Sequence, residues 1–421
     1  RLPSADERKR SGGAGVYYHF DYHGGPRSYQ WINTNPLPKI WDQMALAKEY
    51  GADRIWIVNV GHFKGYELPL DFFMSLAWDT GKFTGENCND YNVTWAAEQF
   101  GALHAGEIGH ILSEYARYNG RRKPELLSPY TYSLTDYNEA GKVVSDYRNL
   151  ASQAEKLSKE LPAELQDAFY ELVLFPVKAS ATVNELYYAA GRNDLYARQG
   201  RAATNDMADS VMYLFTADTS LMGYYNRTLA GGKWNHFMDQ AHLGYLGWAD
   251  PPVNSLRAIN IKRIELSEAA EAGVAIEGSG KTWPGSPDDA ILPPVDNYKR
   301  QERYIDIFNK GKQPFAFTAE ADVPWILLSS KSGTVNSETR LKAGVDWSSV
   351  PGGRSTGHII IRAAGKEVTV SLPSLNSNAP EKEGFRGFVE SEGCVSIEAE
   401  HFSGKTSYGN SSWEKITGYG K

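Results

Sequence analysis

The chain has 421 residues and a formal net charge of −7, from 44 lysines and arginines against 51 aspartates and glutamates. This acidic balance argues against nucleic acid or an anionic membrane as a partner, and no apolar stretch approaches the roughly 18 residues that a membrane span needs. Aromatic residues make up 12% of the chain, and aromatic faces are partners of sugar rings as well as core residues. The two cysteines, Cys88 and Cys394, lie far apart and indicate neither a disulfide nor a metal framework.

The first quarter of the chain alternates between strand and helix patterns. A β-branched and aromatic run predicts a strand over 16–22, and an amphipathic helix follows over 37–50. The apolar run 54–61 is typical of a strand buried on both faces, and 68–79 reads as a second helix. This order predicts a parallel sheet built from βαβ units. Two such units cannot close a barrel, so we expect them to complete a structure that precedes Arg1, in a longer protein.

Two further patterns follow along the chain. Four stretches with helical periodicity predict a helical bundle: 92–118, 138–160, 161–191 and 202–229. From about residue 251, short alternating runs separated by Gly, Pro and Ser predict an antiparallel β-sandwich. The expected fold is therefore multidomain, with α/β, α and β parts. The expected domains are 1–88 (a parallel α/β part, which the resemblance described below makes the end of a (β/α)8 barrel), 89–250 (bundle), 251–385 (sandwich) and 386–421 (the start of a further β-module, or a C-terminal extension).

Polar side chains gather at the end of the first predicted strand. His19, Asp21 and His23 alternate, which would place all three on one face. Two histidines and a carboxylate could bind a metal ion; a hydrogen-bonded polar lining near a sugar site and a purely structural role are the alternatives. Without a further ligand cluster, we favour the polar lining and predict neither metal nor cofactor.

Tyr22 and Asn59 lie where the two predicted parallel strands end, and ligands of parallel α/β folds bind beyond that edge. Asn59 interrupts an otherwise apolar run and needs a hydrogen-bond partner, although a turn before Gly61 would also explain it. The nearest carboxylates are Asp21 and Glu67, and neither has a neighbour that marks it as a catalytic acid.

Two other motifs carry weaker signals. "GSGKT" at 278–282 has Ala275 where a phosphate loop needs glycine, and turn residues follow it, so we reject a nucleotide site. The segment 233–252 is rich in polar and aromatic residues, including Trp248. It is typical of a junction that packs on a barrel mouth, and plain interdomain packing explains it equally well.

Several long stretches together resemble the xylan α-1,2-glucuronidases of glycoside hydrolase family 115. They are "GGAGVYYHFDYHGGPRSYQWINTNPL", "YGADRIWIVNVG", "ELPLDFFMSLAWD", "RRKPELL", "AFYELVLFPV" and "KWNHFMDQAHLGYLGW". The resemblance implies the end of a catalytic barrel, then a bundle, then a sandwich. It also implies removal of glucuronic acid or its 4-O-methyl ether from glucuronoxylan with inversion and without a cofactor, and a homodimer.

Carried over residue by residue, the resemblance makes Tyr22 and Asn59 substrate-binding residues and places the catalytic carboxylates before Arg1. We add His19, Asp21, Arg27 and Trp248 as substrate-binding candidates, with Arg27 pairing with the uronic acid carboxylate. The expected partners are glucuronoxylan or its oligosaccharides, the N-terminal portion of the same protein and a second copy, in a bacterial periplasm or outside the cell. The alternatives are a non-catalytic carbohydrate-binding or scaffolding fragment and a metal-dependent hydrolase.

Overall fold

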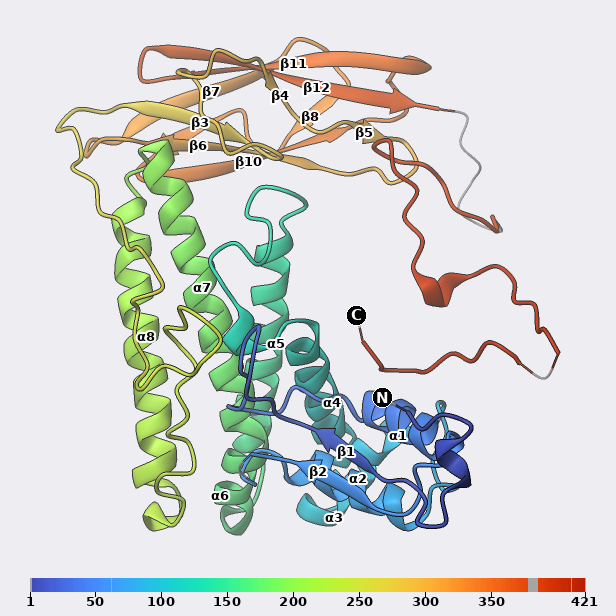
Figure 1. The fold of residues 1–421 in the computed structure, drawn as a ribbon. Helices are drawn as coiled ribbons and strands as arrows, with labels where there is room; N and C mark the ends of the chain where they lie inside the picture. Colours follow the sequence, from blue (N-terminus) through green and yellow to red (C-terminus); the bar gives the residue numbers. More distant parts are fainter. Residues whose placement is uncertain (1, 62, 378–384, 410, 421) are drawn as a thin grey trace.

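The computed structural model describes residues 2–61, 63–377, 385–409 and 411–420. A pair of parallel strands with two helices lies at one end of the molecule, long helices run through the middle, and two sheets cap the other end (Figure 1). The predicted mixture of helices and several sheets is confirmed. No helix in the described part of the chain combines the length and apolar character that crossing a membrane requires.

The N-terminal part forms the predicted alternation of strand and helix. Strand β1 (Val16–His19) pairs in parallel with β2 (Trp56–Asn59), and helices α1 (Leu37–Glu49) and α2 (Glu67–Trp78) follow the two strands. The register pairs Val16 with Trp56 and His19 with Asn59. The first strand is therefore shorter than the predicted 16–22, because the chain turns after His19.

Only one face of this two-stranded sheet is covered. Val16 and Tyr18 pack on the main hydrophobic core. On the opposite face Tyr17 is 59% exposed and Ile57 is 52% exposed. The prediction that 54–61 is buried on both faces is thus wrong for the described residues, since its alternate side chains point to a face that none of them covers.

The middle of the molecule is helical. Its long helices are α3 (Tyr91–Phe100), α4 (Ala105–Arg121), α5 (Glu139–Ser158), α7 (Phe175–Gln199) and α8 (Thr204–Arg227). The predicted single helix 92–118 is broken at Gly101, which has a φ of +85° and ends α3. The short α6 (Gln166–Phe169) runs into α7 through a π-helical stretch, Tyr170–Leu174. Pro176, which lacks an amide hydrogen, lies two residues after this stretch, in the first turn of α7.

Residues 272–376, here called the two-sheet region, contain two sheets. One has the order β3 (Ala272–Ile276), β6 (Arg303–Asn309), β10 (Glu338–Val345), β8 (Ile326–Leu328). The other has the order β4 (Ala290–Ile291), β12 (Lys366–Asn376), β11 (Gly353–Ala363), β7 (Phe315–Ala321), β9 (Ser332–Val335), with β5 (Val295–Asp296) beside β12. One hydrophobic cluster takes side chains from both sheets, so the sheets pack against each other.

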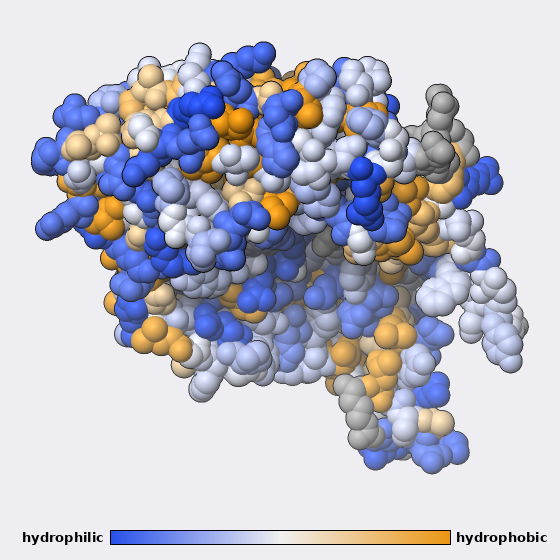
Figure 2. Space-filling model, turned by 90° about the horizontal axis from the view of Figure 1, so that it is seen from above, coloured by the Kyte–Doolittle hydropathy of each residue, from blue (hydrophilic) through white to orange (hydrophobic). Residues whose placement is uncertain are grey.

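Residues 385–420 leave the two-sheet region and return toward α1 (Figure 1). Their described part contains a short 3-10 turn, Ala399–His401, and isolated bridges. Whether these residues begin a further β-module or form a C-terminal extension therefore stays a prediction. From above the sheets, this tail stands off at one side of a surface where hydrophilic groups outnumber scattered apolar ones (Figure 2).

The contact between α3 and α4 gives a test of the helix packing. A Cβ atom added at Gly109 would lie 2.8 Å from the backbone N and Cα of Val93, whereas one at Gly106 of the same helix meets nothing within 4 Å. We expect Gly109→Ala to lower the free energy of unfolding by about 1–3 kcal/mol because the backbones must separate. Gly106→Ala should stabilise by up to about 1 kcal/mol. Denaturant titration of both variants checks this, and equal effects would contradict the packing.

Candidate functional site

The carboxyl ends of β1 and β2 place His19 and Asn59 side by side. The Asn59 amide Nδ2 lies 3.3 Å from His19 Nδ1, and the Asn59 Oδ1 accepts a hydrogen bond from the Gly61 amide at 3.2 Å. Asn59 therefore closes a turn and also faces the neighbouring strand end, so the two explanations of this residue are compatible.

The chain beyond β1 forms a short hairpin-like loop. Tyr22 and Tyr29 exchange two backbone hydrogen bonds of 2.9 Å. The Tyr22 ring is partly exposed and lies 6.3 Å from the His19 ring, centre to centre. Asp21 is buried and sits against the backbone of Gly61, whose positive φ leaves no room for a Cβ atom. His19, Tyr22 and Asn59 thus lie together, while Asp21 points inward.

His23 turns away from the other two members of its predicted row. Its Nδ1 lies 3.3 Å from an Asp250 carboxylate oxygen, and its ring packs edge-on against Trp248 at 5.4 Å. The Trp248 carbonyl accepts a hydrogen bond from the Ser28 amide at 2.9 Å. The strand alternation fails because the strand ends at His19. Within the described ranges, no group of three or more His, Cys, Asp or Glu is placed to hold a metal ion.

A buried carboxylate holds the loop in place. Glu125 Oε1 accepts hydrogen bonds from the backbone amides of Gln30 at 2.8 Å and Trp31 at 2.9 Å. Burial raises the pKa of Glu125, against the effect of these amides. The Glu125 carbonyl accepts from Arg27 Nη1 at 2.9 Å, and the Arg27 guanidinium lies 5.0 Å from the centre of the Tyr245 ring. Arg27 is therefore held by contacts with Glu125 and Tyr245.

Trp31 connects this loop to the helices. Its indole stacks on the His242 ring with centroids 3.5 Å apart and planes 6° from parallel. His242 Nε2 lies 2.9 Å from Asp218 Oδ1 on α8, and both side chains are fully buried. Burial alone would lower the pKa of His242, but the Asp218 carboxylate outweighs it and raises that pKa. A buried, hydrogen-bonded pair, His242 and Asp218, therefore lies beneath the tryptophan.

A second buried cluster holds the loop that follows β2. Lys64 Nζ lies 2.9 Å from Glu67 Oε1 and 2.8 Å from Glu171 Oε1, and also 3.9 Å from the centre of the Trp234 ring. Glu171 belongs to the π-helical stretch, a feature that often marks functional sites. Burial and the neighbouring Glu67 raise the pKa of Glu171 to about 7. Glu67 is thus engaged with a lysine.

Comparison with known proteins identifies both ends of the chain. Residues 1–126 match the model of glycosyl hydrolase family 115, and residues 387–421 match the model of the family 115 C-terminal domain. Both ends of the chain are therefore similar to glycosyl hydrolase family 115. The resemblance stated from the sequence motifs is confirmed, and the strand ends described above lie in the first matched segment.

One solved structure is similar in fold over most of the chain. This structure is a GH115 4-O-methyl-alpha-glucuronidase, BtGH115A, with specificity for decorated arabinogalactans. It is 20% identical with a TM-score of 0.52, and the match covers 89% of this chain and 52% of that one. The chain thus spans about half the length of that structure. A search of curated proteins gives no match.

Other similar structures are partial. A Bacteroides ovatus GH5 xyloglucanase is 12% identical over 26% of this chain and 20% of its own, with a TM-score of 0.19. WR4, a C. elegans MSP family member, is 13% identical over 20% of this chain and 92% of its own, with a TM-score of 0.17.

Four residues that hold the loops beside the strand ends were not among the predicted site residues: Lys64, Glu125, Glu171 and His242. Three of them lie in stretches that carry the family resemblance, "RRKPELL", "AFYELVLFPV" and "KWNHFMDQAHLGYLGW". The presence of a glutamate or histidine inside such a stretch was the only sign that these residues matter. Their hydrogen-bond partners lie far away in the sequence, so the sequence alone did not show what they hold.

Glu171 gives a pH-dependent test. Its pKa is about 7 in the folded chain and near 4.5 when unfolded, so the unfolded state releases this proton first. The contribution of Glu171 to stability is therefore complete below about pH 4.5 and is lost as the pH rises through about 7. Relative to Glu171→Gln, the wild type should lose up to about 3 kcal/mol between these limits. Denaturant titrations at several pH values measure the difference.

The matched control is Glu155→Gln, which removes a half-exposed glutamate paired with Lys178. Its stability difference from the wild type should be nearly independent of pH. A Glu171→Gln difference that is equally flat would show that Glu171 ionises normally.

Proposed function

We propose that this chain supplies one wall of the active site of an α-glucuronidase. The enzyme would hydrolyse α-1,2-linked glucuronic acid or 4-O-methylglucuronic acid side chains of glucuronoxylan, with inversion and without a cofactor. The observation that carries the proposal is the pair of family 115 matches at the two ends of the chain, one of which contains the polar strand ends. The substrate named for BtGH115A makes decorated arabinogalactan a second candidate.

The described residues support a binding role and not the bond-breaking step. His19, Tyr22 and Asn59 present polar and aromatic groups at one edge. An inverting hydrolase needs an acid and a base roughly 6.5–9.5 Å apart across the scissile bond. Asp21 is buried against Gly61, and Glu67 is engaged with Lys64. We therefore assign the acid and base to residues outside this chain.

A preceding portion of the same protein would complete the site. The exposed face of β1 and β2 carries Tyr17 and Ile57, and exposed Ile55 adjoins it. Further parallel strands of a (β/α)8 barrel would cover these side chains and complete the pairing of β1 and β2. The shared length with BtGH115A, about half of that structure, supports the same conclusion. A homodimer and a periplasmic or secreted location belong to this proposal.

The alternative is a non-catalytic carbohydrate-binding or scaffolding role for helices and sheets. The two proposals differ in what the chain does alone. As part of an enzyme, residues 1–421 should release no uronic acid from glucuronoxylan and should regain activity when a preceding barrel portion is present. Saturable xylan binding by the isolated chain, with no hydrolysis in the longer protein, would favour the alternative.

Asn59 and Tyr22 give the first residue-level test in the longer protein. We expect Asn59→Ala and Tyr22→Phe each to lower kcat/KM on glucuronoxylan by about 10-fold or more, equivalent to about 1.4 kcal/mol of lost transition-state binding. Tyr213→Phe, which changes an exposed tyrosine on α8, is the matched control and should leave the rate unchanged. Full activity in both variants would refute the assigned edge.

Arg27 gives the second residue-level test in the longer protein. If it pairs with the uronic acid carboxylate, Arg27→Ala should raise KM for the acidic substrate, and Arg27→Lys should recover part of the loss because it keeps the charge. Both variants lose contacts that Arg27 makes to Glu125 and Tyr245, so their melting temperatures are measured alongside. A melting temperature that falls while KM stays constant would leave Arg27 only a structural role.

A further inference from the structure

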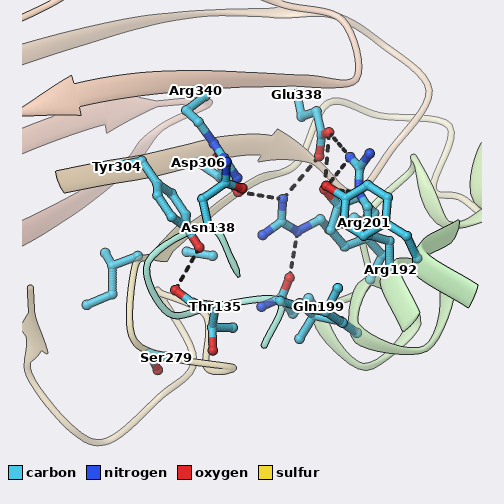
Figure 3. Close-up of a pocket in the computed structure, with 16 residues that line it drawn as sticks. Thr135, Asn138, Arg192, Gln199, Arg201, Ser279, Tyr304, Asp306, Glu338 and Arg340 are labelled. Carbon is cyan, nitrogen blue, oxygen red and sulfur yellow. Dashed lines mark hydrogen bonds and ion pairs between the residues drawn. The ribbon is translucent and has the colours of Figure 1, made fainter. Parts of the chain in front are cut away.

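A cavity of about 330 Å³ lies where the helices meet the two-sheet region, away from the strand ends. Figure 3 shows its lining. The side chains come from the end of α7, from strands β3, β6 and β10, and from the loop before α5. The volume is at the lower end of the range of small-molecule sites.

The cavity carries an excess of positive charge. Three arginines line it, Arg192, Arg201 and Arg340, against two carboxylates, Asp306 and Glu338. Arg340 binds Asp306 through two hydrogen bonds of 2.7 and 3.0 Å. Arg192 Nη2 lies 2.8 Å from Glu338, and Arg201 Nη1 bridges the two carboxylates at 3.2 and 3.0 Å. The five groups leave one positive charge unbalanced in the lining of the cavity.

Arg201 is the buried arginine of this set, at 2% exposed, and its partner Asp306 is also buried. The Arg201 Nε donates a hydrogen bond to Gln199 Oε1 at 2.6 Å. Its planar guanidinium packs on the rings of Tyr196 and Phe308, with Cζ 4.2 and 4.4 Å from the two ring centres. These contacts fix the guanidinium and leave its second terminal nitrogen, Nη2, without a hydrogen bond among the described residues. In Figure 3 this nitrogen points into the space between the lining residues.

Neutral polar groups surround the same space. The Asn138 amide makes no hydrogen bond among the described side chains, and the Ser279 hydroxyl accepts from the Lys281 amide at 3.1 Å, which leaves its proton free to donate. Asn138 has a φ of +52°, a conformation that asparagine tolerates better than most residues. A charged group and several hydroxyl-binding groups therefore face one cavity.

We propose that this cavity binds a small hydroxycarboxylate of the uronic acid class, with its carboxylate on Arg201 Nη2 and its hydroxyls near Asn138 and Ser279. The single negative charge of such a ligand would balance the one excess positive charge of the lining side chains. A phosphate or sulfate dianion would carry more negative charge than the one excess positive charge, and Asp306 and Glu338 would repel it. The anion site stands on the cavity alone; the choice of a uronic acid rests on the proposed function, whose product it would be.

The test is calorimetric titration of D-glucuronate into the protein with any preceding portion retained. Saturable binding should persist in Asn59→Ala, in which the strand-end site is impaired. It should weaken at least about 10-fold in Arg201→Lys, which keeps the charge but loses the free donor. Glucose, lacking the carboxylate, and inorganic phosphate should bind more weakly. Arg362→Lys, on an exposed part of β11, is the matched control.

Arg201→Lys also alters the ion pairs with Asp306 and Glu338, so a second variant is needed to separate a loss of binding from a loss of structure. Asn138→Gly combined with Ser279→Ala leaves the arginines intact and keeps the backbone at residue 138 unstrained. It should weaken binding several-fold at an unchanged melting temperature. Binding lost in Asn59→Ala but kept in both cavity variants would overturn the proposal, as would tighter binding of phosphate or no binding at all. Because hydrolysis is measured separately, an inactive protein that still binds glucuronate through Arg201 would refute only the proposed function.

Discussion

The candidate site depends on one buried carboxylate, that of Glu125. It accepts hydrogen bonds from the backbone amides of Gln30 and Trp31 and so fixes the loop that carries Tyr22. Trp31 in turn lies flat on His242, which is paired with Asp218 of α8. Burying such charged groups costs free energy unless each has good partners. The hydrogen bonds between segments offset that cost, and they fix the position of the strand ends relative to the helices.

The two ends of the helical part are joined to their neighbours by different chemistry. Toward the parallel strands, the contacts are the stacked rings of Trp31 and His242, the hydrogen bonds of the buried Glu125 carboxylate and the ion pair of Glu171 with Lys64. Toward the sheets, Arg201 bridges two acidic residues on β6 and β10. Ionic and hydrogen-bonded junctions are geometrically more specific than apolar ones. The helices therefore act as a spacer of defined length and orientation.

Local patterns predicted the order of elements and the parallel edge, because periodicity and turn residues report on neighbours in the sequence. They predicted Tyr22 and Asn59 at the ends of the two strands, and the structure brings His19 beside both of them. They failed for Asp21 and His23, since the assumed alternation stops when the strand ends at His19. They also missed the break at Gly101 and the π-helical stretch. Glu125 and Lys64 could not be found this way, because their partners are up to about a hundred residues distant.

The tail is held at both of its ends. Glu392 forms an ion pair of 2.7 Å with Arg303 in the two-sheet region, and the Tyr419 hydroxyl donates to Asp42 on α1 at 3.2 Å. Between these points the chain bypasses the helices. The tail therefore closes the chain into a loop, because it links the two-sheet region back to α1 along a second route outside the helices. A single peptide-bond cut in this segment would open that loop without touching either core.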